Sequence, residues 1–372
     1  MSDNRLRWLK LASMSWVGPT LLAGLIKKFK DPGMAMVAPV SEILKIQGWD
    51  VTRAKRFAFE VSKSKPLCTL EELEQKEIRL ITFNDPEYPP LLREIPDSPL
   101  VLFAKGQKLG DCSPAIAIVG ARNASQMGYE IAHDFAYKLS KAGFTIVSGL
   151  ALGIDTYAHK GAVEAEEKTI AVLANGVDVT YPKANAKVRE SVLKNGTLLS
   201  EYAPGVAPLP WYFPIRNRII SGICVATLVV EASARSGSLI TARLAGEQNR
   251  EIFAVPGGLG NSPSEGTMNL IREGANLVTS PEEIIDYYQN ILPEKKLLSF
   301  EKLKEEEKIS DNSLTEEERK ILARLATGAT IDELTSEGWK IDKLFSLLLQ
   351  LEMRNYIVKL SGERYQTRRQ IK

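Results

Sequence analysis

Between residues 115 and 255, short apolar runs alternate with longer stretches of helical periodicity. A strand that is apolar at nearly every position is buried on both faces, as in a parallel sheet covered by helices on both sides. The pattern therefore predicts an α/β fold with a doubly wound, mostly parallel sheet. The predicted strands are Ala115–Val119, Phe144–Val147, Thr169–Leu173, Thr197–Leu199, Ala226–Val230 and Glu251–Val255.

The stretches between these strands fit crossover helices. In residues 128–142, Ile131, Phe135 and Leu139 form one apolar stripe, and Gly143 follows as a residue suited to a helix end. In such a sheet the carboxyl ends of the strands meet helix N-termini with unpaired N–H groups, so ligands bind at that edge. We call it the carboxyl edge and expect the functional site there.

Two smaller domains are predicted around this core. Residues 1–75 contain short helices broken by Gly18-Pro19 and Asp31-Pro32-Gly33, which indicates a helical module with a faint likeness to helix-hairpin-helix proteins. The core is expected at residues 76–292 and a charged linker at 293–313. Residues 314–372 have the pattern of three helices followed by a hairpin, which is typical of a winged helix.

Composition narrows the class of ligand. The net charge of the chain is only +2, and residues 113–290 carry 15 basic and 17 acidic side chains, so any nucleic-acid site must be local. The three cysteines and two histidines have no metal-ligand or disulfide spacing, and we expect neither a metal nor another cofactor. No signal peptide or membrane span is apparent, which predicts a cytoplasmic protein without a membrane partner.

The carboxyl edge gathers glycines, cations and aromatic rings. Small residues let backbone N–H groups approach a phosphate, cations neutralise it, and flat rings stack on unpaired bases. This combination favours a single-stranded nucleic acid. The candidate residues are Gly120, Arg122, Ser125, Ser148, Gly149, Lys183, Phe213, Arg216, Asn217 and Arg218, with Arg235, Tyr181, Tyr202 and Tyr212 nearby.

Structural roles compete with this interpretation. Gly120 and Gly149 also fit tight turns, and Arg216 and Arg218 also fit ion pairs with Glu201 or Glu231. Known catalytic motifs are missing: there is no Gly-Lys-Ser/Thr phosphate loop, no G-x-G-x-x-G turn after the first strand, and no nucleophile elbow. The sequence therefore predicts a binding protein and not an enzyme.

Five separated motifs together resemble one family. They are Gly120-x-Arg122-x-x-Ser125, the segment 146–155, the segment 181–185, the segment 213–219 and the segment 236–241. In this order they are similar to the DNA-processing protein A (DprA/Smf) family. The likeness extends from about Arg79 to Asn290, and the helical module and winged helix fit the layout common in that family.

The resemblance implies an extended Rossmann-like core that binds single-stranded DNA, forms homodimers and loads the recombinase RecA during natural transformation. It implies that Arg122 and Lys183 are the main phosphate contacts. Gly120, Ser125, Ser148 and Gly149 would line the pocket, which Phe213, Arg216 and Arg218 would complete.

Two other functions fit parts of the sequence. A nucleotide phosphoribohydrolase-like enzyme shares a Rossmann-like sheet and a Pro-Gly-Gly turn, here at Pro256–Gly258, but Asn261 and Ser264 stand where its signature has Thr and Glu. A transcription regulator would use the winged helix, whose basic tail permits contact with duplex DNA, or with a protein partner.

Overall fold

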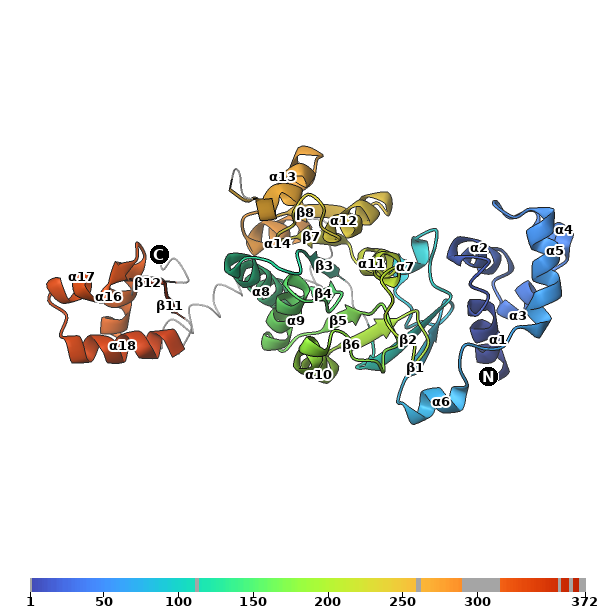
Figure 1. Ribbon diagram of the computed structural model, residues 1–372, viewed down its shortest axis with the longest axis horizontal. Coiled ribbons are helices and arrows are strands. Elements are labelled where there is room, and N and C mark those ends of the chain that lie inside the picture. The colour runs from blue at the N-terminus through green and yellow to red at the C-terminus, as the bar shows by residue number, and fades with distance from the viewer. Residues whose placement is uncertain are drawn as a thin grey trace. The chain divides into compact units, whose positions relative to one another are not determined.

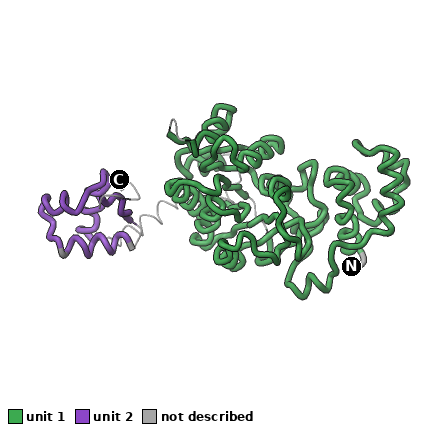
Figure 2. Tube along the Cα trace, in the orientation of Figure 1, with its two compact units in different colours: residues 1–300 green, residues 301–372 purple. Residues whose placement is uncertain are grey.

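The computed structural model describes residues 2–110, 114–258, 262–289, 315–353, 356–360 and 364–367. The chain divides into two compact units, residues 1–300 and 301–372 (Figure 2). The predicted linker at residues 293–313 lies outside the described residues. No described helix is both long and apolar enough to cross a bilayer.

A nine-stranded mixed sheet forms the centre of the first unit in the described residues, in the order β1-β2-β6-β5-β4-β3-β7-β8-β9. Neighbours from β6 to β9 run parallel, whereas β1 and β2 add an antiparallel edge. The strands are β1 (Arg79–Thr82), β2 (Val101–Gly106), β3 (Ala115–Val119), β4 (Thr145–Ser148), β5 (Thr169–Val172), β6 (Thr197–Ser200), β7 (Ala226–Val229), β8 (Glu251–Ala254) and β9 (Asn276–Leu277).

All six predicted strands are confirmed to within one residue at each end. The sequence pattern missed the antiparallel β1 and β2 and the two-residue β9. Each parallel strand is linked to the next by at least one helix, and in Figure 1 helices flank the strands on both sides. The helices of the core are α7 (Pro90–Glu94), α8 (Gln126–Lys141), α9 (Ile154–Glu164), α10 (Ala186–Asn195), α11 (Tyr212–Ile223), α12 (Ser238–Glu247), α13 (Glu265–Arg272) and α14 (Pro281–Gln289).

Short helices precede the sheet, as predicted. They are α1 (Ser2–Ala12), α2 (Pro19–Phe29), α3 (Pro32–Met36), α4 (Val40–Ile43), α5 (Val51–Glu60) and α6 (Leu70–Gln75). Their breaks follow the chemistry of the turns: Gly18 has φ 84° before the Pro19 that begins α2, and the Asp31 side chain caps α3.

The N-terminal helices share one hydrophobic core with the sheet. A continuous cluster of buried side chains extends from Leu9 and Leu11 of α1 to Leu102 and Phe103 of β2. Arg5 of α1 also donates a hydrogen bond to the carbonyl of Leu80 in β1, at 2.8 Å. The N-terminal helices and the sheet therefore belong to one compact unit. The predicted boundary at residue 75 falls inside this unit, where the chain changes from helices to strands.

The second unit has its own core. Three helices, α16 (Glu316–Leu325), α17 (Ile331–Ser336) and α18 (Ile341–Met353), pack with a small antiparallel sheet in the order β10-β12-β11. The strands are β10 (Ala329–Thr330), β11 (Ile357–Lys359) and β12 (Arg364–Thr367). Thr315 and Glu318 form a capping box at the start of α16.

Replacing Leu11 by alanine tests the shared core. Leu11 is fully buried, so Leu11→Ala is expected to lower the free energy of unfolding of the first unit by about 2–5 kcal/mol. Val37→Ala is the control, because Val37 is 76% exposed and its truncation is expected to change stability by no more than about 0.5 kcal/mol. Urea unfolding followed by tryptophan fluorescence measures both, and equal effects would contradict the shared core.

Candidate nucleic-acid interface

Two glycine-containing loops pack against each other at the carboxyl edge. The loop after β3 contains Gly120–Ser125, and the loop after β4 contains Gly149–Gly153. The N–H of Ile154 donates to the carbonyl of Ala121 at 3.2 Å. Gly153 has φ 81°, and a Cβ there would lie 2.2 Å from the Ala121 carbonyl oxygen, so only glycine lets the loops meet.

Glu231, directly after β7, holds the loop that follows β3. Its carboxylate accepts hydrogen bonds from the Ser125 N–H at 2.9 Å and from the Ser125 hydroxyl at 2.6 Å. The same hydroxyl accepts from the Gly128 N–H and caps α8. A carboxylate of the chain itself therefore stands at the start of α8, where a Rossmann-like fold offers N–H groups to a phosphate.

Arg216 of α11 lies beneath the two loops. Its side chain is buried, and it donates to the carbonyls of Gly149, at 2.8 Å, and Val172, at the ends of β4 and β5. No described carboxylate forms an ion pair with it. Burial and, to a smaller extent, the charge of Arg122 lower the pKa of Arg216 to about 10, although the nearby Asp155 carboxylate acts to raise it. Arg216 therefore keeps its charge at neutral pH, and that charge is only partly compensated.

Asp155 holds the loop after β4 from below. Its buried carboxylate accepts from the N–H groups of Gly149, at 3.0 Å, and Ala151, at 3.4 Å. Burial raises the pKa of Asp155, although Arg216 and these N–H groups pull it down. These contacts give Asp155 a structural role in the first turn of α9.

Arg218 has carboxylate partners, unlike Arg216. It is 4% exposed and pairs with Glu201 at 2.5 Å and with Asp97 at 3.2 Å. Burial alone lowers the pKa of Arg218, but the two carboxylates outweigh it and the pKa is raised. Of the two ion-pair alternatives that the sequence left open, the pair with Glu201 is present for Arg218.

The segment after β5 is fastened to the same loops. The Asn185 amide donates to the carbonyls of Leu150, at 2.9 Å, and Ala151, at 3.1 Å, and to the Thr156 hydroxyl, at 2.9 Å. These bonds hold the short helix η2 (Lys183–Asn185), which follows a cis Tyr181–Pro182 bond. Asn185 is the last residue of the motif at 181–185, but the sequence does not predict which residues it contacts in the folded chain.

An exposed cluster lies above these buried groups, and we define it as Arg122, Tyr181, Lys183 and Phe213. The half-buried Phe213 ring is 5.3 Å from the Arg122 guanidinium and 5.7 Å from the Tyr181 ring. Arg122 and Lys183 are exposed, and no described carboxylate forms an ion pair with either. The cluster thus combines unpaired positive charge with aromatic surface, which is the chemistry of a single-strand site.

Comparison with known proteins identifies the family. Residues 79–289, more than half of the chain, match the family model of DNA recombination-mediator protein A. The chain belongs to this family. It is a DNA-processing recombination mediator by that membership.

Relatives and solved structures agree with the family match. Protein Smf of Escherichia coli (strain K12) is 39% identical over 335 residues, which cover 88% of this chain and 87% of the relative. The X-ray structure of DNA processing protein A from Streptococcus pneumoniae is similar with a TM-score of 0.65 at 35% identity, covering 77% of this chain and 98% of that one. The structure of DNA processing protein A from Helicobacter pylori, a protein with a unique single-stranded DNA binding mode, has a TM-score of 0.53 at 30% identity and covers 57% of this chain and 96% of that one.

Within the family motifs, the predicted site residues fall into two layers. Arg122, Lys183 and Phe213 belong to the exposed cluster. The other predicted residues hold the edge together through internal bonds. Ser148 is fully buried and donates to the Ile118 carbonyl at 2.7 Å, and Asn217 accepts from Arg216 at 3.3 Å. A Cβ on Gly149 would lie 2.5 Å from the Arg216 guanidinium, so this glycine makes room for the arginine.

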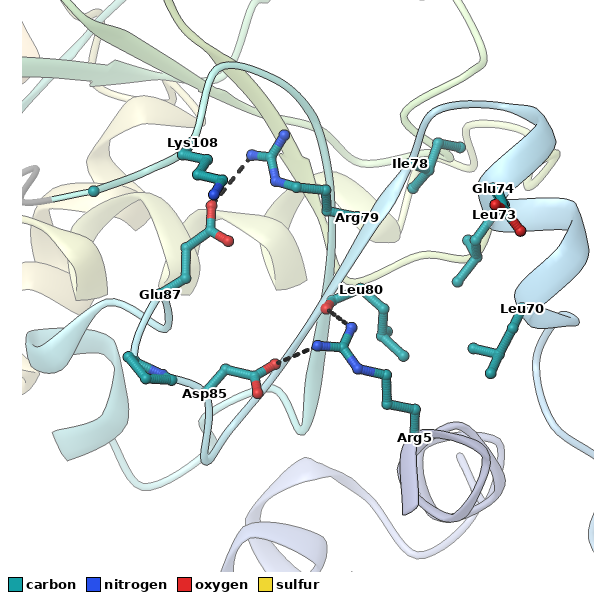
Figure 3. Close-up of a pocket in the computed structure, with 12 residues that line it drawn as sticks. Arg5, Leu70, Leu73, Glu74, Ile78, Arg79, Leu80, Asp85, Glu87 and Lys108 are labelled. Carbon is teal, nitrogen blue, oxygen red and sulfur yellow. Dashed lines mark hydrogen bonds and ion pairs between the residues drawn. The ribbon is translucent and has the colours of Figure 1, made fainter. Parts of the chain in front are cut away.

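A cavity of about 700 Å³ lies away from the carboxyl edge. It is bounded by Arg5 of α1, by α6 and β1, and by the loop that carries Asp85 and Glu87 (Figure 3). Its arginines are already bound: Arg5 to Asp85 at 3.8 Å, and Arg79 to Glu87 at 3.2 Å. Both arginines of this cavity are thus engaged by carboxylates, unlike Arg122 and Lys183, and Lys108 also lines it. Among the described residues, no group of His, Cys, Asp and Glu side chains converges as a metal site.

Breaking the Arg218 ion pairs tests their structural role. Arg218→Met leaves Glu201 without its partner in a site where its side chain is only 16% exposed, so a loss of about 3–5 kcal/mol in unfolding free energy is expected. Adding Glu201→Gln removes the unpaired charge and is expected to restore part of the loss. Arg243→Ala, in a pair that is 71% exposed at the arginine, is the control. Chemical denaturation measures all three, and a mild effect of Arg218→Met would contradict a structural role.

Proposed function

We propose that this protein binds single-stranded DNA at the exposed cluster, with Arg122 and Lys183 as the phosphate contacts. The observation that carries the proposal is the exposed, unpaired Arg122 beside the half-buried ring of Phe213, with the exposed Lys183 two residues after Tyr181, whose ring also contacts Phe213. Counterion release drives such binding, and the partly uncompensated charge of Arg216 below adds to the local potential. The slightly acidic composition of the core does not oppose this, because the charge is local.

A single strand fits the cluster better than a duplex. Phe213 and Tyr181 offer aromatic surface beside Arg122, and unpaired bases can stack on such surface, whereas the bases of a duplex are already stacked. Tyr202, in the loop after β6, stacks on Tyr212 of α11 with ring centroids 4.1 Å apart and adds a second aromatic pair. The Helicobacter pylori relative supports the same class of ligand.

The remaining predicted residues set the shape of the site. We propose that Gly120, Ser125, Ser148 and Gly149 line the pocket and set the loops, as the hydrogen bonds of Ser125, Ser148 and Gly149 favour. Arg216, which also donates to the Asn217 side chain, anchors the start of α11 and thus Phe213 to the ends of β4 and β5, and Arg218 ties that helix to Glu201 after β6. Direct contact of Arg218 with phosphate would require its carboxylates to be displaced.

Family membership also suggests what happens to the bound DNA strand in the cell. The bound strand is handed to the recombinase RecA during natural transformation, in the cytoplasm, by a homodimer that performs no catalysis of its own. The alternative, a nucleotide phosphoribohydrolase-like enzyme, has less support, because the family match covers the whole sheet. The second unit is proposed to be a winged helix, since three helices and an antiparallel hairpin follow in that order.

Removing both cations tests the site. Arg122→Ala combined with Lys183→Ala is expected to weaken single-strand binding and to reduce the slope of log K against log salt by roughly 1.4, because each phosphate contact contributes about 0.7. Lys108→Ala with Lys194→Ala is the matched control, since both lysines lie by the opposite edge of the sheet. Fluorescence anisotropy across salt measures this, and an unchanged slope would remove the cluster from the interface.

Replacing Phe213 separates stacking from charge. Phe213→Leu keeps an apolar side chain but loses the ring, so affinity is expected to fall by about 1–3 kcal/mol while the salt slope stays the same. Trp211→Leu is the control, because Trp211 is 59% exposed and contacts only the Tyr212 ring among described aromatic residues. Equal losses for both variants in the same anisotropy titration would argue against stacking at Phe213.

A further inference from the structure

Two tyrosine rings stack against each other where α8 and α9 begin. The ring centroids of Tyr129 and Tyr157 are 4.5 Å apart, and the ring planes differ by only 6°. Each tyrosine is the fourth residue of its helix, and each helix directly follows one of the two loops at the carboxyl edge. In Figure 1 the two helices lie side by side, in agreement with their close packing. We call these two residues the tyrosine pair, and it lies next to the loop that carries Arg122.

The surface around the tyrosine pair is open to solvent. Met127, in the first turn of α8, is 63% exposed, and Leu152, in the loop after β4, is 44% exposed. Both rings are half-buried, as the Phe213 ring is, and no described residue forms a hydrogen bond with either tyrosine hydroxyl. A buried tyrosine hydroxyl usually has a partner within the protein. These two hydroxyls and the ring edges beside them are instead available to a ligand.

A cation accompanies the tyrosine pair. The ammonium group of Lys160 in α9 lies 4.5 Å from the centroid of the ring on the same helix. Lys160 is exposed, and no described carboxylate forms an ion pair with it. The carboxylates beside the pair have other partners. Glu130 accepts from the Gln126 amide at 3.0 Å, and Glu164 contacts His133 at 2.8 Å. The surface therefore combines aromatic rings with a cation, as the exposed cluster does.

We propose that the tyrosine pair and Lys160 form a second contact region for the DNA strand that the exposed cluster binds, an inference that rests on the proposed function. The two regions are joined by a direct contact between the loops. The N–H of Ile154, the first residue of α9, donates to the carbonyl of Ala121, next to Arg122. Tyr157 follows Ile154 by three residues, a rise of about 4.5 Å along the helix. The tyrosine pair thus continues the surface that begins at Arg122.

The arrangement fits a continuous single strand. Unpaired bases of any kind can stack on an aromatic ring, and a cation beside the ring can contact the backbone. A mononucleotide occupies one region at a time, whereas a strand that leaves the exposed cluster over the loop contact reaches both. The second region therefore adds to the affinity of long strands and leaves that of the shortest ones unchanged.

Affinity measured against strand length tests the proposal in the full-length protein. Tyr129→Leu is expected to leave binding of an oligothymidylate of about five nucleotides unchanged. It is expected to weaken binding of one of about twenty by roughly fivefold or more, the low end for stacking one base. Tyr137→Leu is the matched control, since Tyr137 is a half-buried residue of the same helix, two turns farther from the carboxyl edge.

Three outcomes of this titration would overturn the proposal. They are an unchanged affinity of Tyr129→Leu for the long strand, an equal loss for the short strand, and an equal loss in Tyr137→Leu. Failure of the proposed function looks different. The double variant Arg122→Ala with Lys183→Ala would then bind both lengths as the unaltered protein does, whereas a wrong second region leaves the double variant weak and Tyr129→Leu unaffected.

The cation is tested by the salt dependence of the long strand. Lys160→Met is expected to reduce the slope of log K against log salt by roughly 0.7, because one phosphate contact is lost. Lys168→Met is the control, since Lys168 is exposed and stands directly before β5, at the opposite edge of the sheet. An unchanged slope in Lys160→Met, or the same reduction in both variants, would contradict the second region.

Photo-cross-linking in the unaltered protein guards against a misfolded variant. A single 5-iodouracil, a base that cross-links to aromatic rings on which it stacks, is placed at successive positions of the long strand. Cross-links to Tyr129 or Tyr157 are expected at positions next to those that cross-link to Phe213 or Tyr181. The absence of a cross-link to the tyrosine pair from every position would overturn the proposal.

Discussion

The architecture of the carboxyl edge, where we propose that DNA binds, depends on one buried cation. Arg216 donates to the carbonyl groups at the ends of β4 and β5 from within a site that is nearly closed to solvent. A guanidinium can remain there because its N–H groups find backbone acceptors and because Asp155 partly balances its charge. The loop after β4 must then bend around the arginine, which explains a glycine at position 149.

The fold was largely predictable because strands that are buried on both faces appear in the sequence as continuous apolar runs. Runs such as Ala115–Val119 are apolar at every position, since both faces of β3 are covered. The strand β2 was missed although it is equally apolar at its start, because it ends in Lys105-Gly106 and no helical crossover follows it. Antiparallel edges lack the alternation of strand and helix on which the prediction depended.

The sequence predicts that these residues gather at the carboxyl edge, but not how they divide between exposed and internally bonded side chains. Arg216 and Arg218 stand two positions apart in one motif, yet the first binds backbone carbonyls and the second binds carboxylates. The difference comes from Glu201 and from Asp97, and Asp97 is distant in sequence and reaches Arg218 only in the folded chain. Pairing between distant segments leaves no local pattern, so sequence alone could not tell a phosphate ligand from a structural ion pair.

The carboxylate of Glu231 at the start of α8 has a consequence for selectivity. Mononucleotides and dinucleotides are abundant in cells, and Rossmann-like folds commonly hold their phosphates at this helix start. Here the Ser125 N–H is already bound to a side chain of the protein. The Glu231 carboxylate therefore competes with the phosphate of a small nucleotide at this helix start, whereas a polymer can also contact several separate cations that a single phosphate group cannot reach.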